Sequence, residues 1–231
     1  MTMSTPATPP NAPDCILLAT DLGSRCDRAL DRALALARQW RARLVVLTVV
    51  EPTSTTDRAL QVQAERRLRA DLHGQGDDLA WSARVVRGPV AETILQVTDS
   101  EGAGLIVTGV ARDGVLGRIV LGSAVDTLAR REPVPLLVVR NRWRAPYDRL
   151  LIASDFSPHS RHAFETAMRL FPQAAPALFH AHGNAYPMLA GMDAAQSRAA
   201  AHVQARDEAR VFLDGVAMPG RERGLVPLVL E

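Results

Sequence analysis

Residues 14–33, DCILLATDLGSRCDRALDRA, indicate the fold class. The first part, CILLAT, is a short apolar run that ends at Asp21 and Gly23, which predicts a buried strand entering a loop. Beyond the loop, apolar residues recur at helical spacing from Asp27 to Trp40, with Arg and Asp on the other face. A strand, a loop and an amphipathic helix in this order begin an α/β unit.

The same alternation continues to about residue 140. Arg43 to Pro52 is an unbroken apolar run closed by Pro, as expected of a parallel strand covered on both faces. Five strands and four helices in alternation predict an α/β fold, an open five-stranded parallel sheet with helices on both faces. Ligands of such sheets bind at the carboxyl ends of the strands, where the strand order reverses. After the first helix we expect strands at 43–52, 80–86, 105–108 and 134–139, and helices at 56–72, 91–100 and 124–131.

The chain then repeats its own beginning. Residues 148–167, DRLLIASDFSPHSRHAFETA, match residues 14–33 without a gap, so that Asp155 corresponds to Asp21. Such a self-match predicts a duplication. The second copy continues with an expected strand at 178–182, a helix at 194–213 and a strand at 225–230, and nothing in it corresponds to residues 88–139. We therefore expect a disordered tail at 1–13, a complete domain at 14–141 and an incomplete second copy at 147–231.

Composition restricts the classes of function. Apolar residues make up 47% of the chain and charged residues 23%, as in a globular protein that buries a core. The net charge of +2 comes from scattered charges, which gives no electrostatic footprint for nucleic acid. No apolar run approaches the roughly 20 residues that span a bilayer. Cys15 and Cys26 form no CxxC motif and read as reduced thiols, so we expect a cytoplasmic protein without a membrane partner.

The strongest signal for a site is TGVARDGVLGRIVLGSAVDTL, residues 108–128, in which glycines and a serine separate a strand from a helix. Backbone N–H groups of a glycine loop and of a helix N-terminus point at a common space and favour an anion such as phosphate. Ser123 is either the helix N-cap or a hydroxyl donor to phosphate.

Two aspartates and two histidines have alternative readings. Asp21 either caps the following helix or accepts a hydrogen bond from an exocyclic amine or ribose hydroxyl of a nucleotide. Asp155 has no matching loop in the second copy, so we interpret it as a helix cap. His180 and His182 face the same side of an expected strand, a spacing that metal sites use, but no third ligand is evident. We therefore expect no metal site.

These motifs resemble those of the universal stress protein family. The resemblance rests on Asp21, on Gly88 and Pro89 before a helix that contains Ile94, on LIVTG at 105–109, and on LGS followed by a helix and PVPLLVV. It covers residues 14–140 completely and 148–231 in part. It implies a fold like that of the adenine nucleotide alpha hydrolases.

Members of that family that bind ATP carry Gly, two residues, Gly, nine residues, then Gly followed by Ser or Thr. Here Gly109 fits the first position, and Gly122 with Ser123 fits the last pair. The middle position is Arg112, which either blocks the loop or pairs with phosphate through its guanidinium. We favour retained binding, because Asp21, Gly122 and Ser123 are all intact.

The resemblance also implies which residues bind the nucleotide. Asp21 and the backbone of Val49 would face adenine, residues 109–112 would line the ribose and phosphates, and residues 122–124 would cradle the phosphates. The implied cofactor is ATP, with or without Mg²⁺. The full expected set is Ala19, Thr20, Asp21, Val49, Thr108, Gly109, Val110, Ala111, Arg112, Gly122, Ser123 and Ala124.

Three classes of function follow. The first is a regulatory ATP-binding protein of the stress response that forms a homodimer and has no catalytic residues. The second is a nucleotide-free dimerisation protein, in which Arg112 closes the site and the PVPLLVV strand pairs with another copy. The third is a weak ATP hydrolase or transferase acting through Ser123. The sequence gives the third little support, because it lacks a Walker lysine, a Ser–His motif and any acidic residue in the loop besides Asp113.

Overall fold

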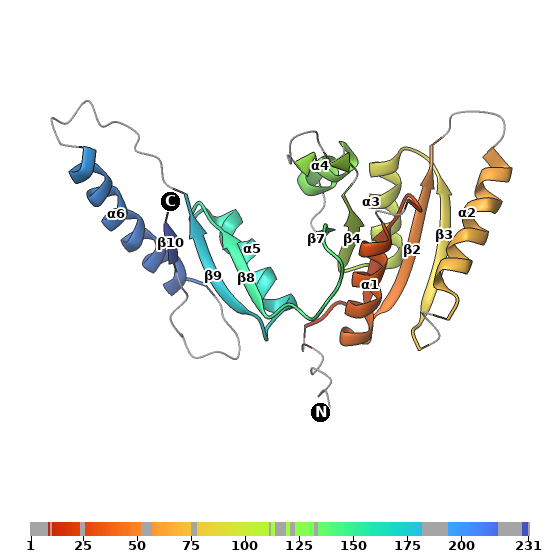
Figure 1. Ribbon diagram of the computed structural model, residues 1–231, viewed down its shortest axis with the longest axis horizontal. Helices are drawn as coiled ribbons and strands as arrows, with labels where there is room; N and C mark the ends of the chain where they lie inside the picture. The colour runs from red at the N-terminus through yellow and green to blue at the C-terminus, as the bar shows by residue number, and fades with distance from the viewer. Residues whose placement is uncertain are drawn as a thin grey trace. The chain divides into compact units, whose positions relative to one another are not determined.

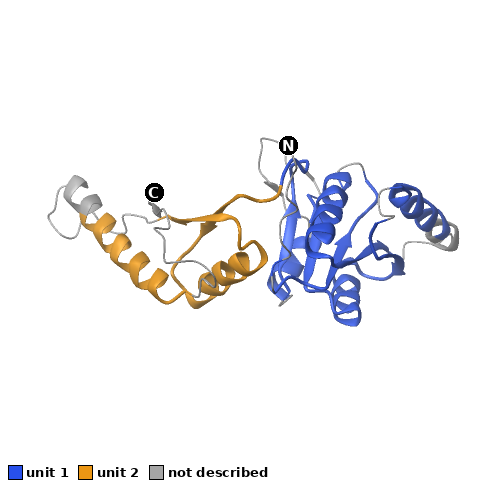
Figure 2. Ribbon diagram, turned by 90° about the horizontal axis from the view of Figure 1, so that it is seen from below, with its two compact units in different colours: residues 1–145 blue, residues 146–231 orange. Residues whose placement is uncertain are grey.

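A computed structural model describes residues 9, 11–23, 26–51, 57–74, 78–110, 112–113, 119–120, 123–131, 134–181, 194–216 and 228–230. The chain divides into two compact units, Met1–Ala145 and Pro146–Glu231 (Figure 2). Most of the tail expected at 1–13 lies outside the described residues. At its described end, the Ala12 N–H donates to the Pro9 carbonyl, 3.1 Å away.

The first unit contains the expected five-stranded parallel sheet, in the order β3-β2-β1-β4-β7 (Figure 1). Every neighbouring pair in it is parallel, which confirms the predicted fold class. The strand order reverses between β1 and β4. The strands are β1 (Cys15–Ala19), β2 (Arg43–Val50), β3 (Trp81–Arg87), β4 (Leu105–Gly109) and β7 (Leu136–Val139), and the helices are α1 (Asp27–Trp40), α2 (Asp57–Leu72), α3 (Val90–Glu101) and α4 (Ser123–Arg131).

Burial of β1 on both faces explains why its sequence is apolar without interruption. Leu17 belongs to a core cluster that includes Ile94 of α3 and Leu128 of α4. Leu18 points to the opposite face, where it lies near Leu30 of α1 and Leu72 of α2. Successive side chains of a strand alternate between faces, so a strand buried by helices on both sides has no polar positions.

The structure contains one element between β4 and α4 that the sequence did not predict. The structure forms a small antiparallel hairpin from β5 (Arg112–Asp113) and β6 (Ile119–Val120). Each strand has only two residues, too short for the alternation of polar and apolar residues that identifies a strand. The glycine-containing segment therefore includes paired backbone as well as loop.

The second unit has a three-stranded parallel sheet in the order β10-β9-β8. This order matches β3-β2-β1 of the first unit. Its core contains Ile152, Phe164, Leu178 and Phe212. Its strands are β8 (Arg149–Ala153), β9 (Ala175–His180) and β10 (Leu228–Leu230), and its helices are α5 (Pro158–Leu170) and α6 (Ala194–Asp214).

The two units share local geometry after their first strands. Leu22 and Phe156 both have left-handed backbones, with φ of 59° and 62°. The Thr20 N–H donates to the Leu47 carbonyl over 2.9 Å, and the Ser154 N–H donates to Phe179 over the same distance. Similar sequences thus give the same strand-to-helix turn in both units.

The sheets differ in what covers one face. Leu17 is 0% exposed under α3 and α4, whereas Leu151, its counterpart on β8, is 68% exposed. Ile152, on the other face of β8, is buried against α5 and α6 residues. Among the described residues of the second unit, no helix takes the place of α3 or α4, so an apolar sheet face remains exposed.

This contrast predicts different costs for the same truncation at matched positions. Leu17→Ala should lower the free energy of unfolding by about 2–5 kcal/mol, because it removes buried methyl groups and leaves a cavity. Leu151→Ala should change it by less than about 0.5 kcal/mol at protein concentrations where the chain is monomeric, because the side chain is exposed there. Denaturant unfolding of the two variants and the wild type measures both values. Equal losses would contradict the exposed face.

Candidate functional site

A cavity of about 170 Å³ lies at the carboxyl ends of β1, β2 and β4. It falls at the point where the strand order reverses, which is where open α/β sheets bind ligands. Residues of α3 and α4 and Cys26 at the start of α1 contribute the remaining wall. Its lining residues are Ala19, Thr20, Asp21, Cys26, Leu47, Val49, Val90, Ile94, Thr108, Gly109, Val110, Ala124, Val125 and Leu128.

The structure gathers most of the expected nucleotide-binding residues around this one cavity. They come from β1, β2, β4 and α4, which are widely separated in the sequence. Ala111 and Gly122 lie outside the described residues, and the structure describes only the backbone of Arg112 and Ser123. The expected residues that line the cavity are Ala19, Thr20, Asp21, Val49, Thr108, Gly109, Val110 and Ala124.

Sequence reasoning missed six lining residues. Five are aliphatic, and they give the cavity an apolar wall. Each resembles an ordinary core residue, so sequence alone does not distinguish it. The sequence held one signal, for Leu47. This residue is two positions before Val49 on β2, so its side chain lies on the same face of the strand. The missed residues are Cys26, Leu47, Val90, Ile94, Val125 and Leu128.

Asp21 is exposed at the cavity, and its carboxylate is held by two donors. Oδ1 accepts hydrogen bonds from the Gly23 N–H, 2.8 Å away, and from the Cys26 thiol, 3.0 Å away. The N-cap of α1 is Cys26, not Asp21. The helix-cap reading of Asp21 is therefore wrong: this carboxylate closes the turn between β1 and α1.

Asp155 makes the corresponding turn in the second unit. It accepts from the Ser157 N–H at 3.0 Å, while Ser157 itself is the N-cap of α5 and accepts from Ser160 N–H at 3.2 Å. The expectation that Asp155 is a helix cap is therefore also wrong. Hydrogen bonds from the side chain and backbone of Ser157 and from the side chain of Ser160 lower the pKa of Asp155 from 3.8 to about 2.

The backbone of Arg112 forms part of β5 and pairs with Val120. Extended backbone of this kind is open to any L-residue, so the position does not need glycine for its conformation. Replacement of the family's middle glycine by Arg112 therefore requires no unusual backbone conformation at this position. The orientation of the guanidinium lies outside what the structure describes.

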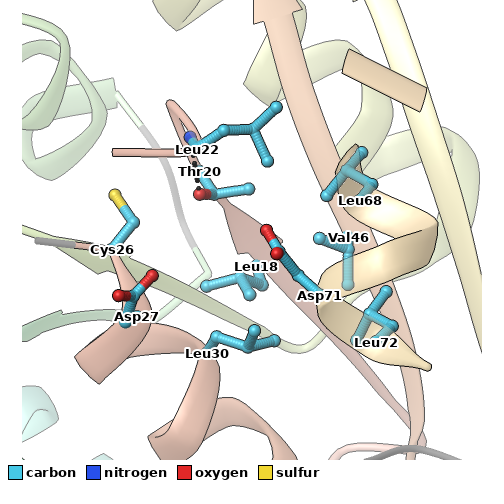
Figure 3. Close-up of a pocket in the computed structure, with 10 residues that line it drawn as sticks. All are labelled: Leu18, Thr20, Leu22, Cys26, Asp27, Leu30, Val46, Leu68, Asp71 and Leu72. Atoms are coloured by element: carbon cyan, nitrogen blue, oxygen red, sulfur yellow. Dashed lines mark hydrogen bonds between the residues drawn. The ribbon is translucent and has the colours of Figure 1, made fainter. Parts of the chain in front are cut away.

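A smaller cavity of about 20 Å³ lies between β1, β2, α1 and α2 (Figure 3). Thr20 and Cys26 line both cavities, and the Thr20 hydroxyl accepts a hydrogen bond from the Leu22 N–H at 3.0 Å. This space holds about one water molecule, which excludes a nucleotide. The larger cavity is therefore the candidate site.

Metal binding finds no support in the described part of the chain. There, no group of three or more His, Cys, Asp or Glu side chains is arranged to hold an ion. His180 Nδ1 lies 2.8 Å from the Ser154 carbonyl oxygen, and the His180 ring stacks on Phe156. His182 lies outside the described residues.

Comparison with known proteins identifies the family. The model of the universal stress protein family matches residues 14–140, more than half of the chain. The chain belongs to the universal stress protein family. The match covers the first unit, including every residue that lines the larger cavity.

Individual relatives agree with this assignment. A universal stress protein of Thermus aquaticus is 34% identical over 133 residues, which cover 54% of this chain and 97% of the relative. One from Mycolicibacterium smegmatis is 31% identical over 137 residues, which cover 56% of this chain and only 46% of the relative. The chain thus spans about half the length of that second relative.

A solved structure extends the comparison to the fold of both units. The crystal structure of a putative universal stress protein from Pseudomonas aeruginosa aligns with a TM-score of 0.61 at 20% identity. The alignment covers 95% of this chain and 74% of that one. Within the described residues, no helix is both long and apolar enough to cross a membrane.

Proposed function

We propose that this universal stress protein binds ATP in the cavity between β1 and β4, and that it acts in the cytoplasm as a regulatory protein without catalysis. One observation carries the proposal. Asp21, Val49, Gly109 and Ala124 come from four distant segments and surround one cavity at the point where the strand order reverses. These are the positions to which the family resemblance assigns nucleotide contacts.

The chemistry of the wall suits a purine nucleoside. Leu47, Val49 and Ile94 offer an apolar surface to a flat base, and the Asp21 carboxylate can accept from its exocyclic amine or from a ribose hydroxyl. Sites for complete drug-sized ligands usually enclose about 300–1,000 Å³. A cavity of about 170 Å³ therefore fits the base and part of the ribose, with the phosphates outside it.

The phosphates would then extend along residues 110–123 toward the start of α4. Helix α4 begins at Ser123, and the N–H groups of a helix N-terminus favour an anion. Arg112 adds a cation on the same segment, and we assign it to phosphate pairing. We assign no side chain of this protein to Mg²⁺, so the ion would enter the site bound to the nucleotide.

Binding without turnover follows from the groups that line the cavity. Among its described lining residues, Asp21 is the one carboxylate, and its Oδ1 already accepts two hydrogen bonds. Hydrolysis would need a base placed against water and a metal held by further carboxylates. We therefore propose a regulatory role.

Calorimetric titration with Mg·ATP tests the proposal in wild type, Asp21→Ala and Asp155→Ala. Wild type should bind, and Asp21→Ala should weaken binding by about tenfold or more, since it removes a charged hydrogen-bond acceptor. Asp155→Ala is the matched control, because Asp155 makes the same turn and does not line the 170 Å³ cavity. It should keep wild-type affinity.

Two outcomes would contradict the proposal. Absence of binding in the wild type would favour the nucleotide-free alternative, and recovery of binding in Arg112→Gly would then identify Arg112 as the cause. Release of phosphate from Mg·ATP above background, lost in Ser123→Ala, would instead favour the hydrolase.

We also propose that the second unit mediates self-association, with a second copy of this chain as the partner. Strand β8 is at the edge of its described sheet. The Ser154 N–H and the Asp148 carbonyl form hydrogen bonds with β9. Alternate residues of a parallel strand bond to the same neighbour, so the backbone N–H and carbonyl of Leu151 point to the open edge. An open edge can pair with its own copy across a twofold axis, which places the two exposed Leu151 side chains close together.

Sedimentation equilibrium of wild type, Leu151→Asp and Val203→Asp tests this proposal. Leu151→Asp should weaken self-association about tenfold or more, because it buries a charge at the contact. Val203 is the matched control, since it is 59% exposed on α6 of the same unit. Equal association in all three proteins, or a monomeric wild type, would overturn the proposal.

A further inference from the structure

Cys26 connects the start of α1 to the candidate site. Its thiol lies 3.0 Å from Asp21 Oδ1, and both residues line the 170 Å³ cavity. The side chain is only 8% exposed, so it occupies the wall between the cavity and α1. Figure 3 shows it beside Asp27, with its sulfur directed away from that carboxylate.

We propose that Cys26 is a positioning residue for nucleotide binding, whose thiol orients the Asp21 carboxylate toward the ligand. This inference rests on the proposed nucleotide site and names a residue that the family motifs leave out. Cys26 would act through Asp21 and would not itself bind the base.

The thiol has the protonation state that this role requires. Burial raises the pKa of Cys26, and its hydrogen bond to Asp21 raises it further. The group therefore stays a neutral S–H donor near neutral pH, and thiols are weak but real hydrogen-bond donors. A thiolate in this place would instead repel the carboxylate.

A carboxylate whose oxygen accepts from two donors is more restricted in orientation than a carboxylate that accepts from one donor. The Gly23 N–H holds Oδ1 from the turn, and the Cys26 S–H holds it from the start of α1. Loss of the thiol would remove one of these two donors from Oδ1, so the orientation of the carboxylate would be less restricted. A group fixed before binding costs less to order when the ligand arrives.

The second unit has a serine at the position that matches Cys26. The self-match aligns Cys26 with Ser160 and Asp21 with Asp155. The Ser160 hydroxyl donates to the Ser157 carbonyl over 3.0 Å and lies 2.9 Å from the Ser154 hydroxyl, within the turn that Asp155 closes. Serine at position 26 is therefore the conservative replacement that the chain itself provides.

Cys15 supplies the matched control. It is a buried cysteine of the same unit, 3% exposed on β1, but it does not line the cavity. If Cys26 served only to fill the core, truncation of either cysteine to alanine would have similar consequences for binding.

The first experiment measures the affinity for Mg·ATP of wild type, Cys26→Ala, Cys26→Ser and Cys15→Ala. Cys26→Ala should weaken binding by about threefold to tenfold, because it removes one hydrogen bond to a charged group. Cys26→Ser should restore affinity to within about twofold of wild type, since a hydroxyl is the stronger donor. Cys15→Ala should bind like the wild type. Wild-type affinity in Cys26→Ala, or no rescue by Cys26→Ser, would overturn the proposal.

The second experiment needs no nucleotide, so it separates this inference from the proposed function. The Gly23 amide donates to the same Asp21 oxygen, and its NMR resonance reports where that carboxylate lies. The resonance should move in Cys26→Ala and return toward its wild-type position in Cys26→Ser, with no change in Cys15→Ala. If the wild type binds no ATP, the proposed function fails while this readout still decides whether Cys26 orients Asp21. An unmoved Gly23 resonance in Cys26→Ala would refute the orientation itself.

Discussion

The pairing of β1 with β4 is the constraint on which the site depends. Strand β1 pairs in parallel with β4, with Ile16 to Ala19 opposite Leu105 to Thr108, although the two segments are about ninety positions apart in the sequence. This pairing brings Asp21, just beyond β1, to the same edge of the sheet as Gly109 at the end of β4. It also places the reversal of strand order here, so neighbouring crossovers leave in opposite directions and open a crevice. Residues of α3 and α4 then close its apolar side.

The second unit shows what happens without that partner strand. It repeats the turn after the first strand, with an aspartate that accepts a backbone hydrogen bond two residues on. Yet β8 is at the edge of its described sheet, and Leu151 is exposed where Leu17 is buried. The same local sequence therefore gives the same turn, while the cavity requires the strand and helices that follow. In our account, nucleotide binding belongs to the first unit and contact with a second copy to the second.

The sequence was sufficient for the features that depend on local pattern. The helix from Asp27 to Trp40 has the bounds predicted from its spacing of apolar residues, and the run from Arg43 gave a buried strand. The sequence was insufficient for elements too short to show a pattern and for features that depend on contacts between distant residues. The hairpin at Arg112 rests on two residues in each strand. Of the two roles that the sequence left open for Asp21, the helix cap is wrong because Cys26 is the N-cap of α1. Ile94 and Leu128 became part of the cavity wall only through packing, which periodicity does not reveal.

A crystal structure of the full chain grown with Mg·ATP would locate the bound nucleotide. We expect adenine in the cavity of the first unit, within hydrogen-bond reach of Asp21 and beside Val49, with phosphates running toward the start of α4. Nucleotide bound elsewhere, or a cavity closed by the Arg112 side chain in crystals saturated with ATP, would contradict this expectation.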